Sequence, residues 1–365
     1  MDKLHFDAPI NQLSFGNVAF NFLRELYKKG VNVATFPQGN SANFESFDKA
    51  DEKLLEWIKR SAFDRYKKLD KNEPTLKLWH LNGGEQRVVP RQYLYTFYEC
   101  DCPTEEEIAV VKSQEHVFFS STESCEHFRK AGCDNVSFVP IGFDRDFYKT
   151  GKQYLGNEVI HFGLVGKFEK RKNTELIIRT WLKKYGNNPK YQLTCLVNNP
   201  FFSPEDFSKI IFNTLDGKRW TNINFLPWLK TNSEVNEFHN AINIDLSGCC
   251  HNEGWSLGSF NSACLGNVCI VGMASAHIDW SSGDNIIPLL PDGKASNEDG
   301  VFFKNGLPWN QGNFYTTNEK DISEAMEKAE KLYVSHPDKF DRSDLIERFS
   351  YEKTIDSILK TIKGE

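Results

Sequence analysis

Residues 160–197 read IHFGLVGKFEKRKNTELIIRTWLKKYGNNPKYQLTCLV, and their pattern predicts the fold of the second half of the chain. Residues 160–165 and 191–197 are apolar runs of strand length. Between them, residues 174–185 carry apolar side chains at helical spacing. A strand, a helix and a second strand in this order are typical of a parallel sheet covered by helices.

The same alternation continues on both sides of this unit. Downstream, strands are predicted at residues 223–226, 241–246 and 268–271, and helices near residues 234–240, 256–265, 321–334 and 351–362. Upstream, strands are predicted at residues 4–6, 31–36, 76–81, 93–97, 116–119 and 136–140, and helices at residues 18–28, 48–72, 105–112 and after residue 120. Residues 149–158 are rich in Gly, Lys and Asn, as expected of a connection between domains.

The length of 365 residues suits two α/β cores. We therefore predict an α/β protein of two Rossmann-like, doubly wound domains with a cleft between them. The first domain is expected to cover residues 1–150 and the second residues 151–340. Residues 341–365 are expected to form a C-terminal helix that packs back toward the first domain.

The composition is that of a folded globular chain, with 39% hydrophobic and 26% charged residues. No stretch approaches the about 20 uninterrupted apolar residues of a membrane span. Residues 1–6, MDKLHF, lack the apolar run of a secretory signal, so a cytoplasmic protein is expected, in the host cytoplasm if it is viral. The net charge of −6 argues mildly against sequence-independent binding to nucleic acid.

The nine cysteines are interpreted as reduced thiols, because the number is odd and a chain of this length needs no covalent staples. Cys100, Cys102, Cys125 and Cys133 form the one cluster that resembles a metal site. A one-residue spacing without a companion CxxC does not fit zinc, so no metal is expected.

The turn at residues 166–173, GKFEKRKN, is the first candidate site. Lys167, Lys170, Arg171 and Lys172 place four cations between a strand and the positive end of a helix, which suits a diphosphate. Gly166 directly after the strand lets a ligand approach the backbone. The alternative interpretation is a solvated charged turn.

The second candidate is residues 251–261, HNEGWSLGSFN. Glu253 stands at a strand end, where its carboxylate can accept hydrogen bonds from sugar hydroxyls. Residues 254–258 open a helix whose backbone N–H groups can receive a phosphate. Asn261 lies eight residues after Glu253, so both side chains can face one cleft. The alternative is a helix start with an N-terminal acid.

The third candidate lies in the first half, where His80 and Glu99 stand at the ends of predicted strands and face the same cleft. A single histidine is more often structural than catalytic, and this alternative stays open for both residues.

Together these residues resemble the GT-B glycosyltransferases, specifically the retaining enzymes of glycosyltransferase family 4. The resemblance covers residues 115–275 and rests on three ordered motifs: residues 120–132 with 139–147, SSTESCEHFRKAG with VPIGFDRDF; residues 166–173; and residues 253–268, EGWSLGSFNSACLGNV. Residues 96–99, TFYE, also echo bacterial members.

The resemblance implies that Lys167 and Lys172 neutralise the diphosphate of a UDP- or GDP-sugar, and that Glu253 contacts the donor sugar. It also implies donor contacts for Gly166, Gly254, Trp255, Ser256, Leu257 and Asn261, and acceptor-side places for Gly16, Asn17 and Glu99. His80 would lie near the reacting sugar. Transfer to a glycan or other hydroxyl would retain the anomeric configuration, without a protein nucleophile, a cofactor or a metal.

The sequence departs from the family at two places. Asn261 stands where the family usually has a second glutamate linked to the nucleotide ribose, so the charge-assisted hydrogen bond is lost. Residues 15–17, FGN, replace a Gly-Gly pair before the first helix.

Three other functions remain as alternatives. A sugar-nucleotide epimerase uses carboxylates and histidines on the same fold. A lapsed transferase would only bind sugar nucleotides or a partner protein. A transferase that modifies bases of viral DNA is less favoured, because the chain shows no strong basic stripe.

Overall fold

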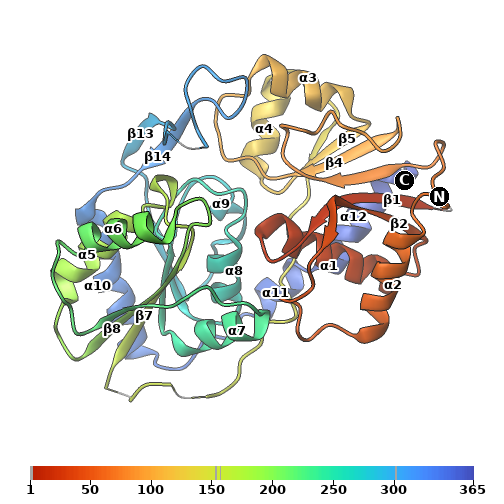
Figure 1. The fold of residues 1–365 in the computed structure, drawn as a ribbon. Helices are drawn as coiled ribbons and strands as arrows, with labels where there is room; N and C mark the ends of the chain where they lie inside the picture. Colours follow the sequence, from red (N-terminus) through yellow and green to blue (C-terminus); the bar gives the residue numbers. More distant parts are fainter. Residues whose placement is uncertain (1–2, 153, 157, 301) are drawn as a thin grey trace.

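The computed structural model describes residues 3–152, 154–156, 158–300 and 302–365, and two parallel sheets lie side by side in it (Figure 1). The first sheet has the order β2-β1-β3-β4-β5-β6. Its strands are β1 (Leu4–Ile10), β2 (Val33–Ala42), β3 (Thr75–Leu78), β4 (Gln92–Thr96), β5 (His116–Phe119) and β6 (Val136–Phe138). The helices of this half are α1 (Ser14–Lys28), α2 (Glu52–Phe63), α3 (Glu105–Ser113) and α4 (Thr122–Lys130).

The second sheet has the order β12-β11-β10-β7-β8-β9. Its strands are β7 (Ile160–Gly166), β8 (Tyr191–Val197), β9 (Ile223–Phe225), β10 (Ile244–Gly248), β11 (Val268–Gly272) and β12 (Ile286–Leu289). The helices that follow β6 along the chain are α5 (Thr174–Tyr185), α6 (Pro204–Thr214), α7 (Asn232–Ala241), α8 (Leu257–Cys264), α9 (His277–Trp280), α10 (Glu319–Ser335), α11 (Ser343–Arg348) and α12 (Tyr351–Lys363).

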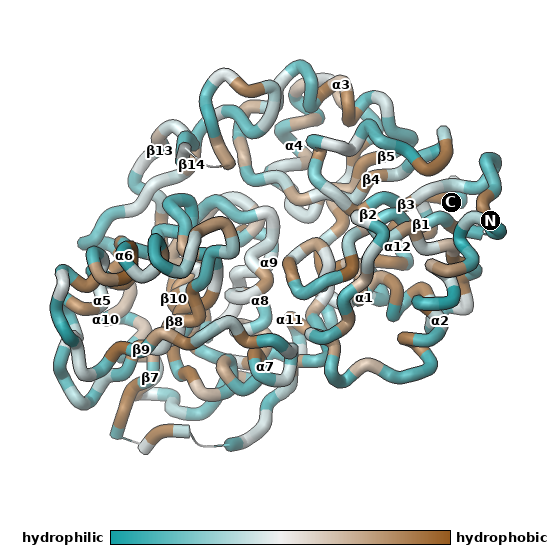
Figure 2. The backbone as a smooth tube through the Cα atoms, in the orientation of Figure 1, coloured by the Kyte–Doolittle hydropathy of each residue, from teal (hydrophilic) through white to brown (hydrophobic). Residues whose placement is uncertain are grey.

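The prediction of an α/β fold with two doubly wound units is confirmed. Every strand pair in both six-stranded sheets is parallel. The inner strands are largely buried because helices cover both faces, whereas the edge strands β2 and β9 are partly exposed. Figure 2 shows β8 and β10 in hydrophobic colour inside the second half. The strand order reverses between β1 and β3 in the first sheet and between β7 and β10 in the second. Ligands bind beyond the carboxyl ends of strands at such reversals.

Several boundaries differ from the prediction. The helix predicted at residues 48–72 is only α2, which Asp51 caps and which ends at Phe63. The residues after it are mostly charged and form turns, because they have little apolar surface to bury. Strand β1 extends to Ile10 and α1 begins at Ser14, inside a predicted loop. Helix α6, with Ser203 as its cap and Pro204 in its first turn, was not predicted.

Residues 290–300 and 302–316, which we call the arm, extend from the second half onto the first (Figure 1). The arm contains the antiparallel pair β13 (Gly293–Ser296) and β14 (Asn313–Thr316). Its Phe303 and Phe314 are buried in one cluster with Phe128 of α4. Lys294 of the arm forms a salt bridge with Asp101 at 2.8 Å. The arm therefore completes part of the first half's core.

The C-terminal helix α12 packs against α1, on the first half. Its Ile355, Ile358 and Leu359 are buried in the same cluster as Phe22. The hydroxyl of Thr354 donates to the carbonyl of Pro140 at 2.8 Å, which ties the helix to the segment after β6. Among the described residues, no helix combines the length and apolarity needed to cross a bilayer.

Candidate functional site

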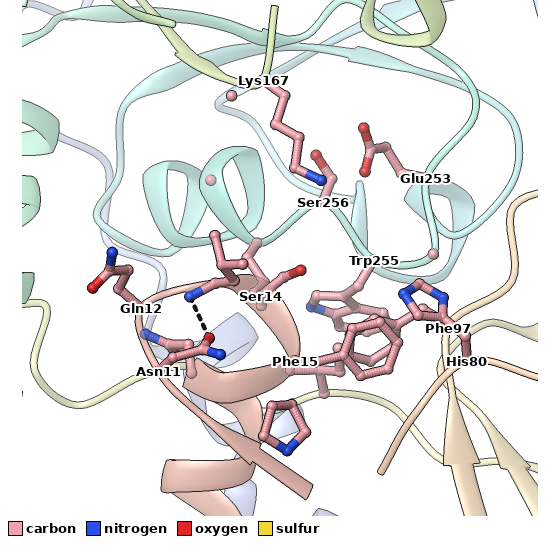
Figure 3. Close-up of a pocket in the computed structure, with 18 of the residues that line it drawn as sticks. Asn11, Gln12, Ser14, Phe15, His80, Phe97, Lys167, Glu253, Trp255 and Ser256 are labelled. Carbon is pink, nitrogen blue, oxygen red and sulfur yellow. Dashed lines mark hydrogen bonds between the residues drawn. The ribbon is translucent and has the colours of Figure 1, made fainter. Parts of the chain in front are cut away.

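A cavity of about 1480 Å³ lies between the two halves, at the carboxyl ends of β1, β3, β7 and β10. Loops from both sheets contribute to its lining. Figure 3 shows the start of α1, with Asn11, Gln12 and Ser14, on one side and Lys167, Glu253 and Ser256 on the other. The cavity therefore occupies the place where the strand orders predict a ligand.

The sequence-predicted residues meet in this one cavity. Those that line it are Asn17, His80, Glu99, Gly166, Lys167, Lys172, Glu253, Gly254, Trp255, Ser256, Leu257 and Asn261. Gly16 is not one of the described residues that line the cavity. A Cβ at Gly16 would lie 2.4 Å from the carbonyl oxygen of Asn11, so this glycine lets α1 pack onto the loop after β1.

The cationic turn and the second candidate segment touch directly. Glu253 accepts a hydrogen bond from the Lys172 ammonium. The Arg171 guanidinium lies 3.3 Å from Glu253 and 2.8 Å from Glu169. It also approaches Glu99 of the first half at 4.0 Å. We call these five side chains the charge cluster; it joins the loops after β4, β7 and β10.

Burial and charge act in opposite directions on the carboxylates of this cluster. Burial by itself would raise the pKa of Glu253, but the charges of Arg171 and Lys172 outweigh it and lower the pKa to about 2. For Glu99, burial is the larger effect and raises the pKa, while Arg171 offsets part of the rise. Glu253 is therefore an anion at neutral pH, held between two cations.

Glu253→Gln is expected to remove a contribution to stability that depends on pH. Because the folded pKa lies below the ordinary 4.5, the carboxylate stabilises the fold above pH 4.5, and this stabilisation is lost as the pH falls toward 2. The gap in unfolding free energy between wild type and variant should therefore shrink over this range. Urea unfolding between about pH 6 and pH 3 measures it, with the exposed Glu175→Gln as control. A constant gap would contradict the assignment.

Gly166 positions Lys172. Its φ of 148° lies outside the range that side chains favour, and a Cβ there would lie 3.2 Å from Cδ of Lys172.

Gly166→Ala is therefore expected to displace the Lys172 side chain and to weaken about tenfold the binding of the nucleotide sugar that the family resemblance implies, roughly the loss of one charge-assisted hydrogen bond. The matched control is Gly156→Ala, since a Cβ at Gly156 meets no atom within 4 Å. Isothermal titration with UDP-glucose measures the effect. Equal affinities in the two variants would count against this role.

The start of α8 presents unused polar groups to the cavity. Ser256 adopts a left-handed conformation with φ of 67°, and no side chain caps the helix that begins at Leu257. The first backbone N–H groups of α8 therefore have no side-chain acceptor. The amide oxygen of Asn261 and the indole nitrogen of Trp255 are buried without a hydrogen-bond partner. Buried polar atoms without partners in a cavity are suited to a polar ligand.

Lys167 is held differently from Lys172. Its ammonium lies over the rings of Phe201 and Phe302, at 5.6 and 5.5 Å from their centroids. Among the described residues it forms no salt bridge, and Figure 3 shows its ammonium directed toward Ser256 at the start of α8. Its positive charge is therefore available to an anion in the cavity.

His80 is exposed to the cavity beside Phe15, with ring centroids 4.4 Å apart. The surrounding protein and the charge of Lys167 lower its pKa to about 4, so the imidazole is neutral at pH 7. In this state it can donate or accept one hydrogen bond without adding charge.

A salt bridge between Lys77 and Asp7, at 3.1 Å in the cavity wall, was not predicted from the sequence. Lys77 is a charge within the predicted strand at residues 76–81, and Asp7 directly follows the predicted strand at residues 4–6; in the structure both lie inside buried strands, β3 and β1. Charged residues are rarely buried unless they are paired, so this pattern was a usable signal. Arg171, one of the four cations of the turn, was not singled out, although it contacts three carboxylates.

The nine cysteines are free thiols. In the part of the chain that the structure describes, no group of three or more His, Cys, Asp or Glu side chains is arranged to hold a metal ion.

Solved structures with a similar arrangement of strands and helices identify the fold. No family model and no curated protein matches the sequence. The sucrose-phosphate synthase tll1590 of Thermosynechococcus elongatus superposes with a TM-score of 0.68 at 12% identity, over 100% of this chain and 99% of that one. Anabaena Alr3699/HepE in complex with UDP and glucose gives 0.64 at 11%, over 100% of both chains. Trehalose-6-phosphate synthase OtsA gives 0.64 at 11%, over 100% and 99%.

At these identities the likeness establishes the fold, which is the GT-B architecture of two Rossmann-like domains with a cleft between them.

Proposed function

We propose that this protein is a glycosyltransferase that moves a sugar from a nucleotide-sugar donor to a hydroxyl acceptor, with retention of the anomeric configuration. The observation that carries the proposal is the convergence of Lys167, Lys172 and Glu253 with the uncapped start of α8 on one interdomain cavity. Anabaena Alr3699/HepE, which has the same fold, was solved in complex with UDP and glucose.

The donor diphosphate would bind between the two lysines and the backbone of residues 254–257. Arg171 contacts all three carboxylates of the charge cluster and offsets part of their charge, so that Lys172 is shared with Glu253 alone, while Lys167 forms no salt bridge among the described residues. These ammonium groups would stabilise the negative charge that develops on the leaving nucleotide. No metal ion is needed for this step in the proposal.

Glu253 and Asn261 would bind the two ends of the donor. The carboxylate of Glu253 can accept from hydroxyls of the donor sugar, and the unpartnered amide oxygen of Asn261 can accept from the ribose. The neutral His80 would lie beside the reacting sugar from the acceptor side, near Asn17 and Glu99. Both UDP and GDP fit this description, because no described contact distinguishes the bases.

The division into residues 1–150 and 151–340, with residues 341–365 as a helix returning to the first domain, is part of the same proposal. The connection after β6 and the packing of α12 on α1 support it. We also infer that the protein acts in the cytoplasm, where free thiols such as its nine cysteines stay reduced.

The proposal is tested with UDP- and GDP-sugars in buffer that contains EDTA. A true donor is expected to raise the melting temperature, since it binds only the folded state, and to be hydrolysed slowly to the free nucleotide. Nuclear magnetic resonance of the transferred sugar then gives the anomeric configuration. If no nucleotide sugar raises the melting temperature or releases nucleotide, the proposed function is wrong. Conversion of the donor to an epimer would identify an epimerase instead.

A further inference from the structure

The half of the cavity formed by the first sheet is almost free of uncompensated charge. Lys77 is paired with Asp7 and donates to the carbonyl oxygen of Gln86 at 3.0 Å. Glu99 lies beside Arg171, and His80 is neutral at pH 7 because its pKa is about 4. This half therefore offers few charges to an ionic ligand.

Arg87 is the other cation of this half among the described lining residues. It is exposed, and its two terminal nitrogens already donate to the carbonyl oxygens of Pro90 and Ser113. The uncapped start of α1 also favours an anion. In Figure 3, however, Ser14 faces Lys167 and Ser256, where we place the donor diphosphate.

Uncharged polar groups line the same half. Asn11, Gln12, Ser14, Gln38 and Ser46 all contribute to the cavity wall. The amide nitrogen of Gln38 and the hydroxyl of Ser46 are buried and have no hydrogen-bond partner. Amides and hydroxyls together supply both donors and acceptors, as hydroxyl groups require. These two unpartnered groups therefore point to a polar ligand without charge.

An aromatic wall lies next to these groups. Phe15 stacks on Phe97 with ring centroids 4.2 Å apart, and Trp79 lies 5.6 Å from Phe15. Trp79 is partly exposed and lines the cavity. An aromatic surface beside polar groups suits a ring that has an apolar C–H face and an edge of hydroxyls.

We propose that this half of the cavity is the acceptor subsite and that it binds an uncharged sugar or glycoside without phosphate. The inference rests on the proposed function and specifies its acceptor. In the reaction, an acceptor hydroxyl oxygen bonds to C1 of the donor sugar while the bond from C1 to the diphosphate oxygen breaks. The nucleotide leaves with that electron pair, and the hydroxyl proton goes to the departing phosphate oxygen.

The test separates the donor from the acceptor. The melting-temperature shift with UDP-glucose reports the donor site and hence the proposed function. Release of UDP from UDP-glucose is then compared with glucose, fructose, maltose and methyl glucoside, and with glucose 6-phosphate and fructose 6-phosphate at equal concentrations. We expect at least one neutral saccharide to stimulate release about tenfold or more over water, and the phosphates to stimulate it far less.

Two results would overturn the inference while leaving the proposed function intact. One is equal or faster release with a sugar phosphate. The other is a normal donor shift with no stimulation by any neutral saccharide. Absence of a shift with every UDP- and GDP-sugar would count against the proposed function, and a shift with another donor alone would move the same acceptor comparison to that donor.

Gln38→Leu is expected to raise the KM for the neutral acceptor about tenfold, the typical value of one hydrogen bond, with kcat little changed. The variant loses no hydrogen bond of the Gln38 amide nitrogen in the folded chain, so it should fold normally. The matched control is Gln192→Leu, because the side-chain amide of Gln192 donates to Asn224 outside this cavity. An unchanged acceptor KM in Gln38→Leu would contradict the placement of the acceptor.

Discussion

Lys172→Ala is expected to lower kcat for sugar transfer by about 10²–10³-fold, the usual cost of removing one group that stabilises charge in a transition state. Lys172 donates a hydrogen bond to Glu253, and its side chain is about 20% exposed, so its charge is little screened by water. Without this ammonium, Lys167 would be the one lysine of the turn at residues 166–173 that lines the cavity and could stabilise the departing diphosphate. Initial rates of UDP release with a saturating acceptor measure the effect.

The same turn provides a matched control. Lys170 is exposed, and its ammonium donates to the carbonyl oxygen of Glu298 in the arm. Lys170→Ala changes the net charge of the protein equally, but it should leave kcat within about twofold, because exposed charges are screened. Lys172→Arg should recover part of the activity. Equal losses in Lys170→Ala and Lys172→Ala would show that only the general charge of the turn matters.

Arg171→Ala is expected to destabilise the fold by about 3–5 kcal/mol, the range observed when one partner of a buried ion pair is removed. The guanidinium is about 9% exposed and contacts Glu169 and Glu253, with Glu99 at 4.0 Å. Without it, these carboxylates would stay buried with Lys172 as their remaining cation in the charge cluster. Urea unfolding at pH 7 measures the change as a lower midpoint.

The control for this variant is Arg179→Ala. Arg179 also forms two salt bridges, with Glu175 and Asp216, but its side chain is 39% exposed. Exposed ion pairs contribute about 0–1 kcal/mol, so the midpoint should hardly change. A midpoint of Arg171→Ala close to that of Arg179→Ala would mean that water already reaches the charge cluster.

The sheets were predictable because their pattern is local. Buried parallel strands and amphipathic helices alternate along the sequence, and α5 and β8 have the predicted bounds. Helix α6 and the arm were missed for different reasons. Residues 204–214 do carry a helical pattern, since Phe207, Ile210 and Ile211 recur at helical spacing after the Ser203 cap, so α6 was predictable and was overlooked. The arm is ordered by contacts with the first half that are distant in sequence, which no local pattern predicts.

The candidate site was partly predictable. Residues after neighbouring strands of a parallel sheet meet at one edge, so the contact between Lys172 and Glu253 follows from β7 and β10 being adjacent. Arg171 of the second half lies beside Glu99 of the first half. This contact was not predictable, because residue spacing in the sequence does not tell how the two halves are placed relative to each other. The roles of all these side chains in binding remain predictions.

The arm has a consequence for how the chain unfolds. Phe303 and Phe314 fill the interior beside α4, while α12 fills the interior beside α1, so the first 150 residues lack part of their own hydrophobic filling. A fragment cut from the rest would expose this surface to water and would be prone to aggregate. Heating the intact chain should accordingly give a single calorimetric transition instead of two, because neither half can melt while the other keeps its native contacts.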